Sequence, residues 1–328
     1  MREYKISFCD EGQKLIKFLF KLLPGASKSL IYKSLRKKNI LYNNKKANGN
    51  EIIKSGDVIE IWFSDETLEN FSKKESKEIL KGNIENFSFK DIILYENEDI
   101  IVVNKPKGML SQRDISRQKS LNDYLLEYIK NSNYSGFKPS ICNRLDKNTS
   151  GTLICAKTFK IAREINELIK NHVINKKYLC LVFGDIKDDL YLKDYLFKNV
   201  ENNKAIVSNE KKEGFLEIKT KVHVIKSFKL HEYPVTFLEV TLLTGKFHQI
   251  RAHLSYIGHP ILGDRKYGNN ESLEISKILE IGRQLLHSYS IEFPENHCLK
   301  ELSGMKIKAP IPKDIMCILN KTKMPTLS

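Results

Sequence analysis

Residues 143–157 read NRLDKNTSGTLICAK, a tight polar loop that runs through Thr-Ser-Gly into an apolar strand. Arg144 and Asp146 lie two residues apart in this loop. A carboxylate at the junction of a loop and a sheet is well placed for catalysis, because loops carry function on a rigid scaffold. Taken alone, the same loop is better explained by an Asp146 that caps a turn or pairs with Arg144.

Two other segments also predict strands. Residues 100–110, IIVVNKPKGML, read as an apolar strand that enters a Pro/Gly turn, which is ordinary by itself. Residues 176–184, KKYLCLVFG, show little alternation, so this strand is expected to be buried on both faces. Tyr178 in this strand is either a core aromatic residue or a platform on which a base stacks.

A dense cationic cluster follows in residues 236–254, TFLEVTLLTGKFHQIRAHL. The first half alternates as a strand, and the second half predicts a helix that ends at residues 258–260, GHP. Lys246, His248, Arg251 and His253 supply the cationic and polar groups. His248 and His253 are five residues apart and do not share a helical face, so no metal site is expected.

Composition excludes several classes of protein. With 328 residues, 41% of them apolar, the chain is long enough for about two domains. It has no apolar run long enough for a membrane span and no secretory h-region. The six cysteines form no C-x-x-C pair, so we expect reduced, buried thiols and a cytoplasmic location. The glycines form no dinucleotide loop, P-loop or nucleophile elbow.

Charge gives the first functional indication. The formal net charge is +15. Residues 1–50 hold twelve Lys/Arg and three Asp/Glu, which is a net charge of +9. Such a surplus favours a polyanionic partner, nucleic acid above all. A general lysine-rich composition that favours solubility explains the total charge equally well.

The N-terminal segment predicts a small separate domain. Apolar spacing indicates a helix over residues 12–22, and Ser27 is placed to cap a second helix. Lys33, Arg36 and Lys37 share one face of that second helix, which is either a phosphate-contact surface or a solvated face. Short strands are expected at residues 40–42, 51–53 and 58–62.

The polar residues 64–90 read as a linker between domains. We therefore expect domain boundaries at residues 1–65, a linker over 66–90, and a second domain over 91–328.

Residues 12–62 resemble the S4 RNA-binding domain, with two helices, a basic second helix and a Ser-Gly-Asp-Val-Ile strand. One departure lies at residues 14–16, where Lys-Leu-Ile stands in place of the family's Arg-Leu-Asp.

Four segments in order resemble the RluA-type pseudouridine synthases over residues 92–318. They are Asn-Lys-Pro-x-Gly, Arg-Leu-Asp-x-x-Thr-Ser-Gly, Lys-x-Tyr-x-x-Leu-Val-x-Gly, and Thr-Gly-x-x-His-Gln-Ile-Arg-x-His-Leu with its following Gly-His-Pro-Ile-Leu-Gly-Asp. The resemblance implies an α+β protein, with an S4 domain before a catalytic domain on a mainly antiparallel mixed sheet with flanking helices. It implies isomerisation of uridine to pseudouridine in RNA, without a cofactor or a metal.

The resemblance also implies site residues. Asp146 is the expected catalytic carboxylate, Tyr178 the ring that stacks on the target base, and Arg251 the cation paired with Asp146. Arginine suits this place because its planar fork can bind a carboxylate through two hydrogen bonds. Either Leu285 or Leu286 is expected to pack against the base.

Further residues are expected to bind RNA, some from the family's active site and some from the basic helix. They are Arg144, Lys33, Arg36, Lys37, Lys246 and His248.

The expected substrate is large-subunit, 23S-type ribosomal RNA, modified by a monomer without membrane contact. A transfer-RNA pseudouridine synthase and a non-catalytic RNA-binding protein of the same fold are the alternatives. Asn143, Lys246 and Phe247 replace the family's usual His, Arg and Thr beside the essential positions. The sequence does not identify the target uridine.

Overall fold

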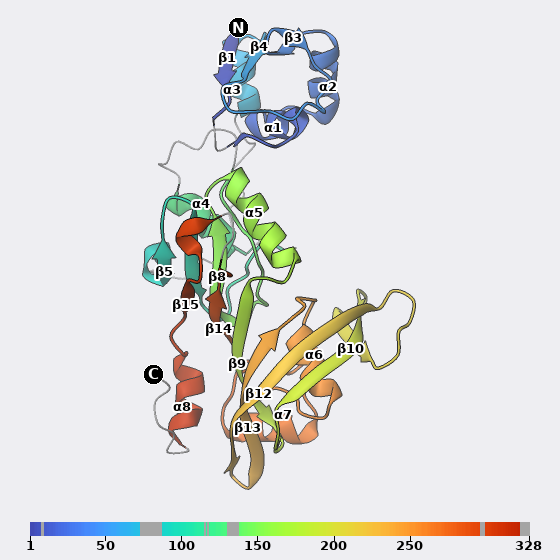
Figure 1. Ribbon diagram of the computed structural model, residues 1–328, viewed down its shortest axis with the longest axis vertical. Helices are drawn as coiled ribbons and strands as arrows, with labels where there is room; N and C mark the ends of the chain where they lie inside the picture. The colour runs from blue at the N-terminus through green and yellow to red at the C-terminus, as the bar shows by residue number, and fades with distance from the viewer. Residues whose placement is uncertain are drawn as a thin grey trace.

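The computed structural model describes residues 1–7, 10–72, 87–114, 116, 118–129, 138–295 and 299–321. These residues form a small N-terminal sheet with its own helices and a much larger sheet. Figure 1 places the N-terminal unit at one end of the long axis of the molecule. The expected linker residues 73–86, Cys9 and Cys298 lie outside the described residues.

The N-terminal unit is a four-stranded antiparallel sheet with three helices. In chain order its elements are β1 (Arg2–Lys5), α1 (Leu15–Leu22), α2 (Lys28–Arg36), β2 (Ile40–Tyr42), β3 (Lys45–Lys46), β4 (Val58–Ile61) and α3 (Asp65–Ser72). The strand order is β1-β4-β2-β3. Strand β1 was not predicted, because it is a short and mostly exposed edge strand. Residues 51–53, expected as a strand, form only an isolated bridge between Ile52 and Lys14.

Helix α2 begins where the sequence places its cap. The Ser27 hydroxyl accepts a hydrogen bond from the Leu30 backbone N–H at 3.2 Å, which satisfies one of the free donors of the first turn. Ile31 and Leu35 are buried in the unit's core. The predicted basic face therefore points to solvent, and its members Lys33, Arg36 and Lys37 are all exposed.

Helix α3 occupies the start of the segment expected to be a linker. Its Leu68 is fully buried in the N-terminal core, and Phe71 packs against the same core. Leu68 and Phe71 are three residues apart, so a helix places both on one face. Their burial against the N-terminal core explains why residues 65–72 form a helix and not a linker.

The second sheet is mixed and mostly antiparallel, as expected. Its strands are β5 (Ile93–Glu96), β6 (Ile100–Lys105), β7 (Ser140–Ile141), β8 (Ser150–Ala156), β9 (Asn175–Phe183), β10 (Leu190–Asn199), β11 (Lys204–Ser208), β12 (Leu216–Leu230), β13 (Tyr233–Leu242), β14 (Leu286–Glu292) and β15 (Lys306–Lys308). The main order is β11-β10-β12-β13-β9-β14-β8-β6-β5, with β7 beside β8 and β15 beside β14. Among these described strands, only β14 and β8 pair in parallel.

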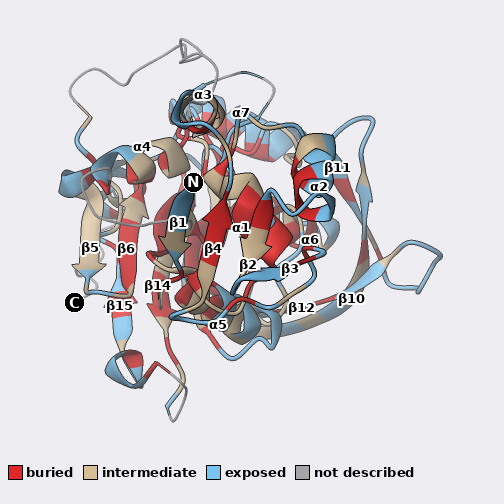
Figure 2. Ribbon diagram, turned by 90° about the horizontal axis from the view of Figure 1, so that it is seen from above, coloured by how far each residue is buried: buried red, intermediate tan, exposed pale blue. Residues whose placement is uncertain are grey.

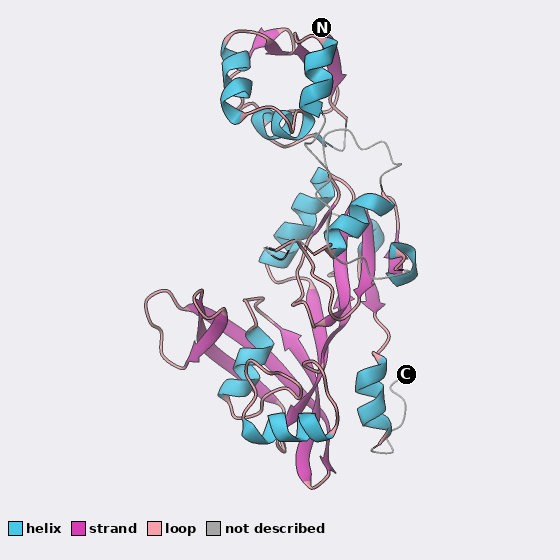
Figure 3. Ribbon diagram, turned by 180° about the vertical axis from the view of Figure 1, so that it is seen from behind, coloured by secondary structure: helices cyan, strands magenta, loops and turns pink. Residues whose placement is uncertain are grey.

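Helices lie against this sheet (Figure 3). They are α4 (Leu121–Tyr128), α5 (Phe159–Lys170), α6 (Gln249–Tyr256), α7 (Asn270–Ile278) and α8 (Lys313–Asn320), with short 3-10 turns η2 (Phe89–Ile92) and η3 (Lys300–Leu302). Figure 2 shows buried residues concentrated in β6 and β14, whereas β10 near the edge carries mainly exposed and half-buried residues. No helix in the described part of the chain is long and apolar enough to cross a membrane.

Strand β9 is buried on both faces, as the lack of alternation predicted. Tyr178, Cys180 and Val182 lie in one core cluster with residues of α6. Leu179 and Leu181 point to the other face, into a cluster with residues of α7 and α8. This burial on both sides fixes β9 in the centre of the sheet.

Helix α6 begins later than the sequence predicts. Residues 244–248 form a loop, and the helix starts only at Gln249. His248 has a φ of 53°, in the left-handed region, so the residue cannot continue a right-handed helix toward the N-terminus.

The cysteines agree in part with the expectation of burial. Cys155 and Cys180 are buried and Cys142 is half-buried, all as free thiols. Cys317 is exposed, contrary to expectation, because α8 buries Ile315, Ile318 and Leu319 and leaves Cys317 off that face.

Candidate active site

The loop of residues 143–149 is fixed mainly through its backbone. The Ser111 hydroxyl donates to the Leu145 carbonyl at 2.8 Å and accepts from the Leu145 N–H at 3.1 Å. The Thr149 N–H donates to the Asp146 carbonyl at 3.0 Å, which closes a turn. Asp146 thus leaves the loop at a defined place, with its side chain 27% exposed.

A buried lysine holds the next carbonyl of the loop. The Lys105 ammonium, fully inaccessible to solvent, donates to the carbonyls of Lys147 at 3.1 Å, Met109 at 2.8 Å and Pro106 at 3.0 Å. Burial lowers the pKa of Lys105 to about 7, although the nearby Asp146 charge acts in the opposite direction. The Asn-Lys-Pro-x-Gly segment, which begins at the end of β6, therefore supports this loop.

A buried arginine holds the carbonyl after that. Arg283 Nη1 donates to the Asn148 carbonyl at 3.1 Å, and also to the carbonyls of Gln284 and Leu286. Its Nε and Nη2 bind both oxygens of Asp314 at 2.8 Å each. Asp314 lies in the first turn of α8, so the C-terminal helix is tied to the loop through Arg283.

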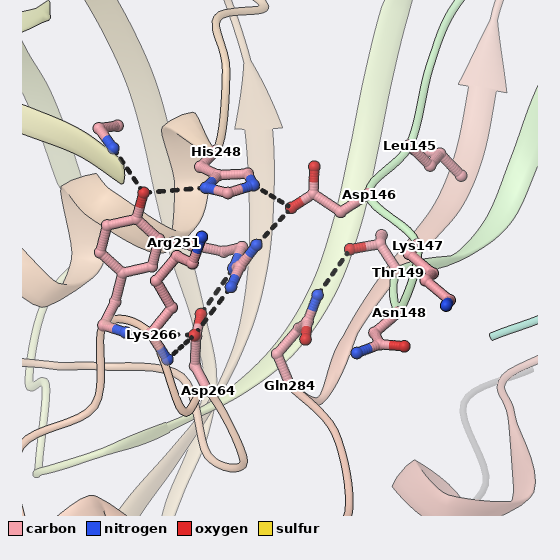
Figure 4. Close-up of polar contacts among 12 residues, drawn as sticks. Leu145, Asp146, Lys147, Asn148, Thr149, His248, Arg251, Asp264, Lys266 and Gln284 are labelled. Atoms are coloured by element: carbon pink, nitrogen blue, oxygen red, sulfur yellow. Dashed lines mark hydrogen bonds and ion pairs between the residues drawn. The ribbon is translucent and has the colours of Figure 1, made fainter. Parts of the chain in front are cut away.

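The Asp146 carboxylate meets a second buried arginine. Arg251 Nη1 lies 2.7 Å from Asp146 Oδ2. Figure 4 shows Arg251 between Asp146 and Asp264, with His248 beside it. The Arg251 side chain is only 9% exposed, and Asp264 is fully buried.

The guanidinium fork points to Asp264 and not to Asp146. Arg251 Nε and Nη2 bind Asp264 Oδ2 and Oδ1 at 2.6 and 2.9 Å. The sequence argument expected the two-bond contact at Asp146, where the structure has a single bond. The reason is that Asp264 lies deeper and takes the fork, which leaves Nη1 for the more exposed carboxylate.

This arrangement keeps Arg251 charged. Burial alone would lower the pKa of Arg251, but hydrogen bonds and charge from Asp264 and Asp146 raise it above the ordinary value. A buried cation with two carboxylates leaves the cluster of three with a net negative charge. The more accessible carboxylate, Asp146, is the one that a substrate can reach.

His248 is the other side chain directed at Asp146. Its Nε2 lies 3.7 Å from Asp146 Oδ2, and its Nδ1 lies 2.9 Å from the Tyr267 hydroxyl. Its side chain is 9% exposed, so it lines the site rather than a free surface. Burial lowers the pKa of His248 to about 4, so the imidazole is neutral at physiological pH.

Tyr178 lies in the core beside this site. It is 6% exposed and belongs to the same cluster as Leu145 and Leu286. Burial raises the pKa of Tyr178 to about 12, with a hydrogen bond to Ser288 acting the other way. Its hydroxyl therefore stays protonated, and the side chain offers a neutral ring.

The structure separates the two candidate leucines. Leu286 packs with Tyr178 and Leu145, whereas Leu285 lies in the cluster on the other side of the sheet. Of these two residues, Leu286 is the one beside the loop that carries Asp146.

The remaining predicted residues fall into two groups. Arg144 and Lys246 are exposed and come from the segments that carry Asp146 and Arg251. Lys33 and Arg36 lie on α2 of the N-terminal unit and Lys37 lies at its C-cap, and none of the three is part of this cluster.

Four residues that organise the site were not predicted: Lys105, Asp264, Tyr267 and Arg283. Asp264 ends the family motif Gly-His-Pro-Ile-Leu-Gly-Asp, Tyr267 follows three residues later, and Lys105 stands in Asn-Lys-Pro-x-Gly. Their roles depend on contacts across large sequence separations, which a single sequence does not reveal.

A family model and individual relatives of this chain both indicate one family of proteins. A model of the RNA pseudouridylate synthase family matches residues 99–256. The chain is 31% identical over 309 residues to a ribosomal large subunit pseudouridine synthase C of Rickettsia typhi, covering 91% of this chain and 94% of the relative. It is also 31% identical to an uncharacterized RNA pseudouridine synthase of Mycoplasma genitalium, covering 87% of each.

Solved structures share the fold. Human RNA pseudouridylate synthase domain containing 4 superposes with a TM-score of 0.59 at 21% identity, over 73% of this chain and 96% of that chain. Human RNA pseudouridylate synthase domain containing 1 gives 0.56 at 22% identity, over 75% of this chain and 99% of that chain.

Proposed function

The chain belongs to the RNA pseudouridylate synthase family, and from that premise we propose that it converts uridine to pseudouridine in large-subunit ribosomal RNA, with Asp146 as its catalytic carboxylate. The observation that carries the proposal is the half-exposed Asp146 carboxylate bound at 2.7 Å by the buried Arg251. Relatives that span nearly the whole chain and are named for the ribosomal large subunit support this choice of RNA.

The reaction needs one carboxylate and no other reagent. The N1–C1′ bond of uridine breaks, the uracil turns, and a C5–C1′ bond forms. C5 gives up a proton and N1 takes one, so no atom is gained or lost. An ionised Asp146 acts on the sugar, as a nucleophile at C1′ or as a base. Arg251 stabilises that ionised form, because it stays charged and lies in direct contact.

The flipped uracil needs a new stacking partner. A base that leaves its stack loses the attraction of its neighbours, and a ring in the active site offsets that loss. Tyr178 supplies a neutral ring, and Leu286 supplies apolar surface in the same cluster. We assign both to the base and leave Leu285 to the core on the opposite face.

Contacts to phosphate come from exposed cations. Arg144 and Lys246 are exposed beside the site and would bind the RNA backbone near the target nucleotide. Lys33, Arg36 and Lys37 on α2 would bind a more distant part of the RNA, as the basic helix of an S4-like domain. The proposed working form is a cytoplasmic monomer.

The test is a pseudouridine map of ribosomal and transfer RNA from cells with and without the gene. We expect at least one site in large-subunit ribosomal RNA to disappear on deletion and to return with the wild-type gene. Loss of a site in transfer RNA alone would replace the proposed substrate. No lost site in any RNA would favour a non-catalytic RNA-binding protein.

A further inference from the structure

The imidazole of His248 lies between the Asp146 carboxylate and the phenol of Tyr267. Its Nδ1 is 2.9 Å from Tyr267 Oη, and its Nε2 is 3.7 Å from Asp146 Oδ2. Figure 4 shows the ring of His248 aligned edge-on to Asp146. The first distance is a hydrogen bond, and the second is too long for one in this unliganded state.

The hydrogen bonds around Tyr267 set the tautomer of His248. Tyr267 Oη already accepts a hydrogen bond from the Ala205 N–H at 2.7 Å. Its own proton therefore goes to the lone pair of His248 Nδ1. A neutral imidazole with Nδ1 as acceptor carries its proton on Nε2, on the side that faces Asp146.

The Asp146 side leads to the same tautomer. A lone pair on Nε2 would face a carboxylate oxygen and repel it, whereas an N–H there is attracted to it. Two partners on opposite edges of the ring thus agree on a neutral His248 with its proton at Nε2.

The ring is also held mechanically. His248 has a left-handed φ of 53°, an uncommon conformation that tends to occur at functional sites. Phe247 stacks on its face at a centroid distance of 3.7 Å. The ammonium of Lys198, a residue of β10 in the β10–β11 hairpin, lies 4.7 Å from the Phe247 ring centroid.

Tyr267 in turn is fixed by that hairpin. Ala205, which donates to its hydroxyl, lies in β11. The neighbouring Lys266 ammonium donates to the Asn203 carbonyl at 2.8 Å, in the turn between β10 and β11. The position of the hairpin therefore determines where the Tyr267 hydroxyl lies.

We propose that Tyr267 is a positioning residue that fixes the proton of the neutral His248 at Nε2, so that His248 serves with Arg251 as a second donor to Asp146. The proposal rests on the assignment of Asp146 as the catalytic carboxylate. The 3.7 Å separation shortens to a hydrogen bond when the substrate closes the site, as catalytic contacts often do.

Charged groups around His248 come from three segments. Asp146 faces it from the catalytic loop and Arg251 from α6, while Asp264 and Lys266 face it from the following loop. Burial, Arg251 and Lys266 disfavour the charged imidazolium, whereas Asp146 and Asp264 favour it. The Tyr267 hydroxyl contacts Nδ1 itself, so its removal leaves the ring neutral through burial but no longer fixes which nitrogen carries the proton.

The test is the Tyr267→Phe variant, assayed in single turnovers on in vitro transcribed large-subunit ribosomal RNA at several pH values. In Tyr267→Phe the His248 ring stays buried and neutral, but neither ring nitrogen is fixed as the one that carries the proton, so part of the enzyme presents a lone pair to Asp146. We expect the single-turnover rate to fall about tenfold, as for the partial loss of one preorganised donor. The factor should be the same at each pH from about 6 to about 8, because the loss does not come from titration of His248.

The double variant Tyr267→Phe/His248→Gln separates this effect from general loosening. Glutamine carries an N–H donor that does not depend on a tautomer, so Tyr267→Phe should cost little further activity when His248→Gln is already present. Tyr256→Phe is the matched control, because Tyr256 is an exposed tyrosine of α6 whose hydroxyl loss should change nothing.

Three results are informative. A loss in Tyr267→Phe that is absent when the same change is made in His248→Gln supports the proposal. An equal loss in both backgrounds, or no loss, overturns it and leaves Tyr267 with a structural role only. Asp146→Asn is included in the same assay, because turnover in that variant would contradict the catalytic assignment rather than the role of Tyr267.

Discussion

Two buried arginines contact the loop that carries Asp146, the proposed catalytic carboxylate, and they do so in different ways. Arg251 and Arg283 are each about as buried as the other, and each binds an aspartate through two hydrogen bonds. The remaining Nη1 of Arg251 binds the Asp146 side chain, whereas that of Arg283 binds the backbone carbonyl of Asn148. One arginine therefore contacts the proposed catalytic carboxylate, and the other contacts the backbone that carries it.

The supporting aspartates differ as well. Asp264, which holds Arg251, is fully buried, while Asp314, which holds Arg283, is 24% exposed at the start of α8. The Arg251 pair is thus part of the core, and the Arg283 pair ties a terminal helix to the site. The difference suggests that charge and position of Asp146 are controlled separately, so that each can be altered with little effect on the other.

Among variants of the residues that support Asp146, the largest effect is expected from Arg251→Lys. Lysine keeps the charge but cannot bind Asp264 through two hydrogen bonds and Asp146 through a third. We expect kcat to fall about 100-fold, as when one preorganised donor is lost from a transition state. RNA affinity should stay within about threefold, since the residue is buried away from phosphate. Measured kcat and Kd check both.

Arg283→Lys is the matched control for that variant. It changes the same residue type, at similar burial, in contact with the same loop. An equal loss in the two variants would show that the arginines do not differ in role.

Asp314→Asn should have a smaller effect on catalysis. Without the charge of Asp314, Arg283 loses its strongest anchor, and the Asn148 carbonyl is held less firmly. We expect kcat to fall about tenfold with KM unchanged, because a small displacement of a catalytic group slows the reaction without removing a substrate contact. A change in KM alone would place Asp314 with the RNA-binding residues instead.

The same variant should show a pH-dependent loss of stability. Burial alone would raise the pKa of Asp314, but hydrogen bonds from Arg283 and Lys107 lower it from 3.8 to about 2. A carboxyl with a lowered pKa stabilises the fold above its unfolded-state pKa and loses that contribution as the pH falls through the folded value. We expect the free energy of unfolding of wild type to exceed that of Asp314→Asn by at most about 2 kcal/mol at pH 7.

Urea unfolding of both proteins at a series of pH values measures that difference. It should shrink as the pH falls from about 4 to about 2, where the unfolded and then the folded carboxyl take up a proton. A difference that stays constant over this interval would mean that the ion pair is not its source.

The smallest effect on the reaction is expected from the N-terminal basic face. Replacing Lys33, Arg36 and Lys37 with alanine should weaken RNA binding several-fold and lower the slope of log affinity against log salt by up to about 3. The rate at saturating RNA should not change, since these side chains are remote from Asp146.

A matched control removes three other cations. Lys170, Lys187 and Lys229 have side chains 74%, 75% and 71% exposed, and their replacement changes the net charge equally. Equal weakening in both triple variants would show that total charge, not α2, governs binding.

Much of the site could be predicted because its residues stand in compact sequence motifs. The loop with Asp146, the strand with Tyr178 and the segment with Arg251 each have a local pattern, and so do the buried strand β9 and the Ser27 cap. These features depend on neighbours within a few residues, which a single sequence shows.

The supporting contacts could not be predicted, because they join distant segments. Arg283 meets Asn148 across 135 residues, and Lys105 meets Lys147 across 42. The pairing of Arg251 with Asp146 was expected only through the family resemblance. Which carboxylate takes the Arg251 fork depends on relative depth, and depth follows from the packed fold. The start of α6 was placed too early because the left-handed φ of His248 has no marker in the residue type.

The most direct test of the account compares wild type with Asp146→Asn on an RNA that contains a mapped target uridine. Asparagine has nearly the same shape but no charge and no nucleophilic carboxylate. We predict no pseudouridine in single turnovers with excess Asp146→Asn enzyme, and an RNA Kd within about threefold of wild type. Turnover by Asp146→Asn would contradict the central claim that the carboxylate held by Arg251 carries out the reaction.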